Sequence, residues 1–437
     1  MKHAIKLGVV CLTRSTFDYP AAGEIYKGIL KDLRNLEQVD VLAVEEPIMD
    51  TQEAVKTGNL FAANLVDGLI VISGTFHLGH LLLEIKKRCD RPVLLWGLPE
   101  LPYDGGKIRL NSVCGLNMNA SNLVKSGITD FTYTVGDQVD ENWVDAVRMI
   151  ALLKQTKLGL IGSRAHGFFN VDIDDLALYG KFGCVLDYVT LGTLFDMPFD
   201  EKLAARHLER IKSFFDTSAV TEDKQRKVAE LAAKFQALAE KEGFTALGIR
   251  CWPEFAPAFG IAPCAAMALA QDEGLIIACE GDMDCAVTML CHKAAGAQTP
   301  YMADLSQVNA LENDALMWHC GVAATGLADG VSTPSLDTYH AGGRGVTAGF
   351  VMKPGPINMA RLDSIRGEYR LFTRRGEAIP MGKELAGTYA KVRFEDPMDK
   401  VLDDVIYSGL AHHVSMVYGD FTRAFEIFAR LKDVPMI

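Results

Sequence analysis

The first hundred residues alternate short, almost wholly apolar runs with amphipathic stretches, and this rhythm limits the possible folds most strongly. Gly68–Ser73 (GLIVIS) and Pro92–Gly97 (PVLLWG) are two of these runs. A strand that is apolar on both sides has to be buried on both sides, as in a parallel sheet covered by helices. We therefore predict strands at 5–12, 39–44, 68–73 and 92–97, with helices at 21–36, 50–65 and 78–89 between them.

The same pattern returns near Lys157 and fades after about Tyr301. Thr221–Lys241 predicts an amphipathic helix that Thr221 caps and Gly243 ends. Strands are predicted at 246–250 and 275–279 around a helix at 262–271, and later at 346–352, 368–373 and 390–394 before a last helix at 420–431. The predicted fold class is α/β, with two consecutive Rossmann-like parallel-sheet domains (1–155 and 156–297) followed by a mainly β domain (298–437).

Charge and composition exclude several classes of protein. The 437 residues include 56 acidic and 44 basic side chains, a net charge of -12, whereas a duplex-binding protein needs a basic surface. The ten cysteines form no C-x-x-C pair, so we expect reduced, mostly buried thiols in a cytoplasmic protein. No apolar run approaches the length of a membrane span, and no G-x-G-x-x-G follows the first strand as in nicotinamide-dependent oxidoreductases.

Carboxylates and imidazoles gather where apolar runs end. Glu280 follows the predicted strand 275–279 and precedes two aspartates, one of which we expect to cap the next helix. Asp304 ends another run, and the adjacent His412 and His413 precede an alternating one, which predicts that their side chains point to opposite sides. Oxygen and imidazole ligands suit Mn²⁺ or Mg²⁺ better than thiolate-bound zinc, so the cysteines are expected to take no part in this site.

At these residues the sequence resembles the L-fucose isomerase/L-arabinose isomerase family. Glu280-Gly281-Asp282 and the following Ala286-Val287-Thr288-Met289 resemble the family's E-[GA]-D segment and A-[LV]-T-M helix, and His413 precedes a V-Y-G-D segment. The resemblance implies that Glu280, Asp304 and His413 bind the metal and that Glu280 and Asp304 are the catalytic acid and base. The candidate substrate contacts are Arg14, His77, Trp252, Glu254, His319, His340 and His412. Of these, His319 also resembles a metal-binding histidine of the arabinose isomerases.

The resemblance implies a metal-dependent aldose–ketose isomerase (EC 5.3.1 type) in carbohydrate metabolism. Mn²⁺, or else Mg²⁺ or Co²⁺, would assist proton transfer between C1 and C2 of a sugar through an enediol. The implied assembly is a homohexamer or another trimer-based oligomer with the active site at the subunit interface.

Two alternatives stay open. The first is the same chemistry on a sulfonated or phosphorylated sugar such as sulfoquinovose, with Arg14, Arg164, Arg250 and Arg344 as candidate anion partners. The second is a non-catalytic sugar-binding protein. Neither a nucleic acid nor a membrane is an expected partner.

Overall fold

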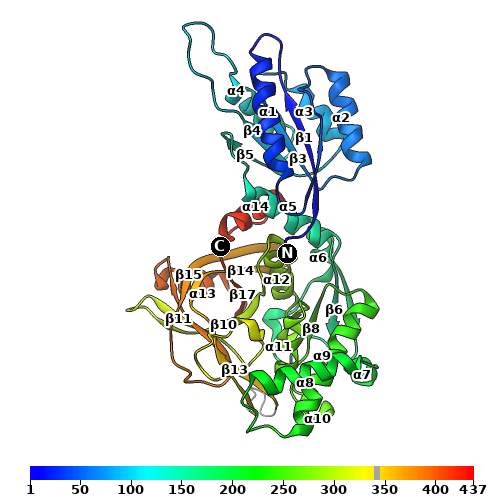
Figure 1. The fold of residues 1–437 in the computed structure, drawn as a ribbon, viewed down its shortest axis with the longest axis vertical. Helices are drawn as coiled ribbons and strands as arrows, with labels where there is room; N and C mark the ends of the chain where they lie inside the picture. The colour runs from blue at the N-terminus through cyan, green and yellow to red at the C-terminus, as the bar shows by residue number, and fades with distance from the viewer. Residues whose placement is uncertain (339–344) are drawn as a thin grey trace. The chain divides into compact units, whose positions relative to one another are not determined.

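The structure is a computed structural model that describes residues 1–338 and 345–437 (Figure 1). His340 and Arg344, both named above, lie outside the described residues. The chain divides into two compact units. The N-terminal unit contains residues 2–151 and 423–435, and the larger unit contains residue 1, residues 152–422 and residues 436–437.

The N-terminal unit is built on a five-stranded parallel sheet in the order β2-β1-β3-β4-β5. The strands are β1 (Ile5–Leu12), β2 (Val39–Ala43), β3 (Gly68–Ser73), β4 (Val93–Gly97) and β5 (Phe131–Val135). The helices are α1 (Tyr19–Arg34), α2 (Thr51–Ala63), α3 (His80–Arg88), α4 (Ser112–Lys125), α5 (Glu141–Lys154) and the C-terminal α14 (Thr422–Lys432). Every residue of β3 and β4 is buried, which confirms the parallel sheet predicted from apolar runs.

The larger unit begins with a second parallel sheet, in the order β7-β6-β8-β9. Its strands are β6 (Lys157–Ile161), β7 (Val185–Val189), β8 (Ala246–Ile249) and β9 (Ile276–Ala278). Helices α6 (Asp175–Phe182), α7 (Leu191–Asp196), α8 (Glu201–Phe214), α9 (Glu222–Glu242), α10 (Phe255–Phe259) and α11 (Cys264–Asp272) accompany it. The Thr221 hydroxyl caps α9 and Gly243 ends it with a φ of 71°, as predicted.

The remaining strands of the larger unit form a mainly antiparallel, barrel-like sheet in the order β11-β10-β17-β14-β15-β16-β13-β12, in which β13 and β16 are parallel. An extra pairing of β11 with β16 closes six of these strands into a ring. The strands are β10 (Tyr301–Asn309), β11 (Asp314–His319), β12 (Ser335–Asp337), β13 (Thr347–Val351), β14 (Gly355–Ile365), β15 (Glu368–Ile379), β16 (Thr388–Phe394) and β17 (His413–Tyr418), with helix α13 (Met398–Ser408) before β17. Two α/β sheets followed by a mainly β part confirm the predicted fold class.

Helix α12 (Met283–Ala295) joins the second parallel sheet to the barrel. It packs against β8 and β9 on one side and against β14 and β17 on the other, and 12 of its 13 residues are buried. Asp282 caps it by accepting a hydrogen bond from the Cys285 amide, which confirms that one of the two aspartates is a helix cap. The start of α12 therefore lies where the sheet and the barrel meet. None of the helices in residues 1–338 and 345–437 is both long and apolar enough to cross a membrane.

Candidate active site

Glu280 lies in a tight turn between β9 and α12. Its backbone has a φ of 62°, a left-handed conformation that is costly for a residue with a Cβ atom. The next residue, Gly281, also has a positive φ, and a Cβ atom there would lie 2.5 Å from the carbonyl oxygen of Ser163. The amide of Ala165 donates to the carbonyl oxygen of Glu280 at 2.7 Å. The turn is thus held against the segment after β6, and this fixes where the Glu280 carboxylate points.

Strand register brings Asp304 and His413 together. Asp304 on β10 pairs directly with His413 on the antiparallel strand β17, so the two side chains share one face of the sheet. The His413 Nε2 atom lies 3.5 Å from Asp304 Oδ1 and 3.1 Å from Glu280 Oε2. Residues 280, 304 and 413, which the family resemblance singles out, therefore converge on one nitrogen atom.

Asp282 sets the orientation of the His413 ring. The His413 Nδ1 atom lies 2.8 Å from Asp282 Oδ2 and donates to it, because an ionised carboxylate only accepts hydrogen bonds. The Nε2 atom of the ring is consequently the one turned toward Glu280 and Asp304. Arg361 donates to the same Asp282 carboxylate at 2.7 Å and to the carbonyl oxygen of His413 at 2.9 Å. A buried carboxylate behind an imidazole is the usual support of a metal-binding histidine.

The donor set fits a hard or borderline divalent cation. His413 Nε2 and Asp304 Oδ1 are buried and have no hydrogen-bond partner among the described residues. Two sets of ligand atoms lie within 4.8 Å of one another, one from Glu280, His319 and His413 and one from Asp304, His412 and His413. Two carboxylates with neutral imidazoles match the ligands that Mn²⁺ accepts. The residues therefore suit the expected metal, although its identity stays a prediction.

Burial and neighbouring charges shift the pKa values in this cluster. Burial would raise the pKa of Glu280, but the imidazoles of His412 and His413 lower it to about 2. Burial raises the pKa of Asp304, and the nearby histidines oppose the rise only in part. Burial would lower the pKa of His413, but the carboxylates of Asp282 and Glu280 raise it to about 9. The imidazole thus faces an excess of negative charge, which a divalent cation would also neutralise.

Both His412 and His413 approach Glu280, so the prediction that they point to opposite sides is wrong. His412 Nε2 lies 3.4 Å from Glu280 Oε2, and the two imidazole rings are 4.0 Å apart. Strand β17 begins at His413, so His412 precedes the strand and does not follow the alternation of a pleated sheet. The Asn170 side chain hydrogen-bonds His412 Nδ1 at 3.0 Å.

Trp252 and His412 both pack against the Phe168 ring. The Phe168 ring packs edge-on against both, with centroid distances of 6.1 Å to Trp252 and 5.6 Å to His412. Glu254, two residues later, is instead bound by Arg250 through two hydrogen bonds of 2.7 Å. Trp252 therefore belongs to an aromatic wall that Phe168 and His412 complete, and His412 contacts the Glu280 carboxylate. The Glu254 carboxylate instead forms an ion pair with Arg250.

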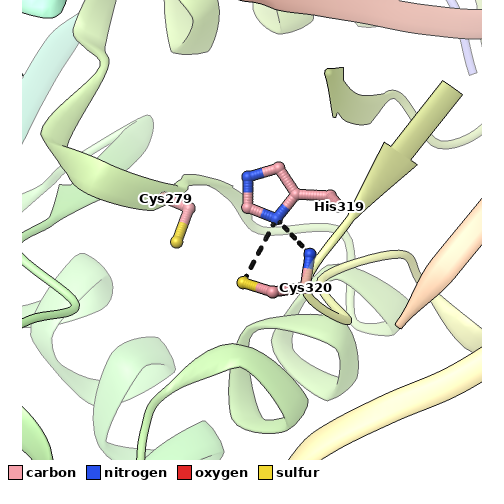
Figure 2. Close-up of side chains that lie close together, drawn as sticks. All are labelled: Cys279, His319 and Cys320. Atoms are coloured by element: carbon pink, nitrogen blue, oxygen red, sulfur yellow. Dashed lines mark hydrogen bonds between the residues drawn. The ribbon is translucent and has the colours of Figure 1, made fainter. Parts of the chain in front are cut away.

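His319 lies at the end of β11 and joins the cluster from the barrel side. The backbone amide of Cys320 donates to His319 Nδ1 at 2.9 Å (Figure 2). Since Nδ1 accepts, the hydrogen of the neutral ring is on Nε2, an atom that is buried and has no hydrogen-bond partner among the described residues. This tautomer favours donation to a substrate oxygen over metal binding.

Arg14 and His77 lie in the N-terminal unit, at the carboxyl edge of its sheet. The loops that carry them meet, since the Arg14 amide donates to Thr75 Oγ1 at 2.9 Å. His77 is fully buried; its Nε2 hydrogen-bonds Ser73 at 3.0 Å and Asn119 at 3.3 Å, and burial lowers its pKa to about 4. The Arg14 guanidinium is half-buried and forms no ion pair with any described residue.

Comparisons with known proteins point in the same direction. Residues 8–155 match the family described as fucose/sulfoquinovose isomerase, N-terminal domain. A sulfoquinovose isomerase from Priestia aryabhattai is 26% identical over 424 residues, covering 94% of each chain. Sulfoquinovose isomerases from Alkalicoccus urumqiensis (26% identical, 85% of this chain and 86% of that protein) and Clostridium sp. strain MSTE9 (25% identical, 83% and 84%) are also similar. These similarities support a fucose isomerase-like family for this chain.

A periplasmic solute-binding protein from Actinobacillus succinogenes with bound D-allose is 11% identical and covers 56% of this chain and 77% of its own, but the TM-score is only 0.17.

Some residues that support the site from outside it are not predicted from the sequence. Arg361 lies mid-strand in β14 and is fully buried, although its charge is typical of a surface residue. Phe168 and Asn170 belong to the segment after β6, for which the sequence predicts no functional residue other than Arg164. A buried arginine and a loop that crosses from another sheet have no signal in local periodicity.

Proposed function

We propose that this protein is a metal-dependent aldose–ketose isomerase whose substrate is a sulfonated sugar of the sulfoquinovose type. Family membership and the sulfoquinovose isomerases that cover more than four-fifths of the chain support sugar isomerisation. The observation that carries the proposal is the meeting of two carboxylates, Glu280 and Asp304, at the Nε2 atom of His413. Proton transfer between adjacent sugar carbons needs acid–base groups and a way to stabilise negative oxygen, and these residues can supply both.

Glu280, Asp304 and His413 would hold the metal. A bound divalent cation stabilises negative charge that develops on the two sugar oxygens during isomerisation. Asp282 and Arg361 keep the His413 ring fixed, so that Nε2 would be available to a bound cation. Manganese is our first choice, with magnesium or cobalt as substitutes, because the set contains oxygen and imidazole but no thiolate.

Glu280 and Asp304 would move the proton. In the forward direction one carboxylate removes the proton from C2 of the aldose, and the proton returns at C1 of the enediol to give the ketose. The other carboxylate serves the neighbouring hydroxyl oxygen. Asp304 and Glu280 both lie within 4 Å of His413 Nε2, so both can reach the same pair of sugar atoms.

His319 and His412 would position the sugar. His319 offers Nε2–H as a donor to a sugar oxygen, and His412 contacts Glu280 from the aromatic wall formed with Phe168 and Trp252. Such walls pack against the apolar face of sugar rings while polar groups bind the hydroxyls.

Arg14 is our candidate for binding the sulfonate. Arg250 is occupied by Glu254, and Arg164 forms an ion pair with Asp172 at 3.1 Å. The Arg14 guanidinium forms no such pair within the described part of the chain, and guanidinium groups bind tetrahedral anions through paired N–H donors. We further propose that Arg14 serves the active site of a neighbouring subunit in a trimer-based or hexameric assembly.

The decisive experiment measures isomerisation of sulfoquinovose and of the same sugar without its sulfonate, with added Mn²⁺ in D₂O. We expect ketose formation only with metal, solvent deuterium at C1 or C2, and a marked preference for the sulfonated sugar. Metal-independent conversion without deuterium entry would contradict the enediol route. Preference for the neutral sugar would contradict the sulfonate assignment alone. Sugar binding without any turnover would instead support a sugar-binding protein.

Glu280→Gln is the matching variant. It removes the acid–base group and a metal ligand while keeping the side-chain shape, so we expect turnover to fall by roughly 10³-fold or more with an unchanged circular dichroism spectrum. Glu312→Gln, at an exposed position in the loop after β10, is the control and should keep full activity. Activity retained by Glu280→Gln would disprove its role.

A further inference from the structure

A group of thiols lies beside the carboxylate and imidazole cluster. No disulfide joins the described cysteines, and the four that form this group, here called the thiol cluster, are at most 4% exposed: Cys251, Cys264, Cys279 and Cys320. They come from four separate segments of the larger unit. Cys251 follows β8, Cys264 opens α11, Cys279 follows β9 and Cys320 follows β11.

The sulfur atoms of the thiol cluster are close together. Cys279 Sγ lies within 4.8 Å of Cys251 Sγ and of Cys320 Sγ, and Cys264 Sγ lies 3.5 Å from Cys320 Sγ. Ligand atoms of Cys279, His319 and Cys320 lie within 4.8 Å of one another (Figure 2). Four thiolates bound to one tetrahedral cation at 2.3 Å would be about 3.8 Å apart, so a bound cation would draw the more distant of the four sulfur atoms closer together than they are here.

We propose that the thiol cluster is a second metal site, which takes a soft tetrahedral cation of the zinc type through four cysteine sulfurs. Each bound thiol releases its proton to solvent, and neither the metal nor the sulfur changes oxidation state. The His319 ring borders the site but keeps its hydrogen bond from the Cys320 amide.

The position of the thiol cluster gives the second metal a structural role. Cys279 directly precedes Glu280, and Cys320 directly follows His319. A cation that holds both sulfurs would tie the Glu280 turn, the end of β11 and the start of α11 together. Because the ligands are thiolates, this site and the oxygen and imidazole site would select different metals. The inference does not rest on the proposed isomerase activity.

Cobalt tests the proposal directly, because its absorption distinguishes the two sites. Co²⁺ in a tetrahedral thiolate site gives strong visible bands and a sulfur-to-cobalt charge-transfer band, whereas Co²⁺ bound by carboxylates and imidazole does not. We expect the wild-type full-length protein, stripped of metal under reducing conditions, to develop these bands on adding Co²⁺. Zn²⁺ should then abolish them at about one equivalent per chain.

Variants assign the bands to residues. Cys279→Ser and Cys320→Ser should lose them, while Cys291→Ser, a buried cysteine in α12, should keep them. Asp304→Asn should also keep them although it loses Mn²⁺ binding, which separates failure of this proposal from failure of the proposed function. If the serine variants do not fold, the wild-type titration still decides. A wild-type spectrum without charge-transfer bands, or bands that survive in both serine variants, would overturn the proposal.

Discussion

At the scale of single residues, Asp282 connects more of the site than any other side chain that we describe. It caps α12 through the Cys285 amide, accepts from His413 Nδ1 and pairs with Arg361, all without contact with solvent. Burial would raise the pKa of Asp282, but Arg361 and His413 hold it well below its usual range. The carboxylate is therefore ionised under all ordinary conditions.

Asp282→Asn should separate this positioning role from catalysis. The amide group of asparagine would direct a donor toward either His413 Nδ1 or Arg361, so one of the two contacts is lost. We expect Mn²⁺ affinity to fall roughly 10–100-fold. We also expect the free energy of unfolding to fall by about 1.5–3 kcal/mol, because buried Arg361 loses a charge-assisted hydrogen bond and keeps only its ion pair with Asp363 among the described residues.

Calorimetric Mn²⁺ titration and urea unfolding measure the two effects of Asp282→Asn. Asp223→Asn, at an exposed position in the first turn of α9, is the matched control and should change neither quantity. Unchanged Mn²⁺ affinity in Asp282→Asn would show that His413 does not depend on this carboxylate for its orientation.

At the scale of elements, one helix joins the sheet to the barrel through a neutral histidine. His292 on α12 is fully buried; its Nδ1 lies 2.9 Å from the Ser415 hydroxyl on β17, and its Nε2 lies 2.8 Å from Asn358 Oδ1 on β14. Since Asn358 Oδ1 accepts, Nε2 carries the hydrogen and Nδ1 accepts from Ser415. Burial lowers the pKa of His292 to about 4.

His292 makes the stability of the larger unit depend on pH. The histidine of the unfolded chain has a pKa of about 6.5. Between this pH and the lower pKa of the folded state, the unfolded chain binds a proton at this histidine and the folded chain does not. Its contribution is fully present above pH 6.5 and is lost as the pH falls through about 4. We expect a loss of about 3 kcal/mol in the free energy of unfolding over this range.

Urea unfolding at pH 7, 6, 5 and 4 measures this dependence. His292→Gln should have a lower free energy of unfolding at pH 7 but a shallower decline with falling pH. His80→Gln, at an exposed position that opens α3, should follow the wild-type curve. An equally steep decline in His292→Gln would assign the effect to other groups.

At the scale of the whole molecule, the chain keeps its candidate groups in two units. Glu280, Asp304 and His413 belong to the larger unit, whereas Arg14 belongs to the N-terminal unit, which the C-terminal residues 423–435 complete. If subunits share active sites as we propose, a defect in each unit can be repaired by a partner with the opposite defect.

Mixing two inactive variants tests the shared site. Arg14→Ala and Glu280→Gln should each have little activity on sulfoquinovose, and mixed oligomers reassembled from both should regain part of it. This follows because some sites would then combine an intact Arg14 with an intact Glu280 from a neighbour. Each variant subjected to the same reassembly alone is the control. No recovery in oligomers proven to be mixed would place both residues in the same subunit's site.

The sequence by itself determined the parts of this protein that depend on local pattern. Apolar runs predicted the buried parallel strands, and the caps of α9 and α12 were readable from Thr221 and from the Asp282/Asp284 pair. The positions of Glu280, Asp304 and His413 were found from motif resemblance. These features lie within short segments, where propensity and periodicity act directly.

Only the tertiary structure decided how those segments meet. The strand β14 escaped prediction because Asn358, Arg361 and Asp363 occupy its buried positions and break the apolar pattern. The register of β10 against β17 places Asp304 opposite His413, and four scattered cysteines converge beside them. Such pairings join residues that are tens to more than a hundred positions apart, so they cannot be predicted from the local sequence pattern. They are fixed by closure of the barrel and by the packing of α12 between sheet and barrel.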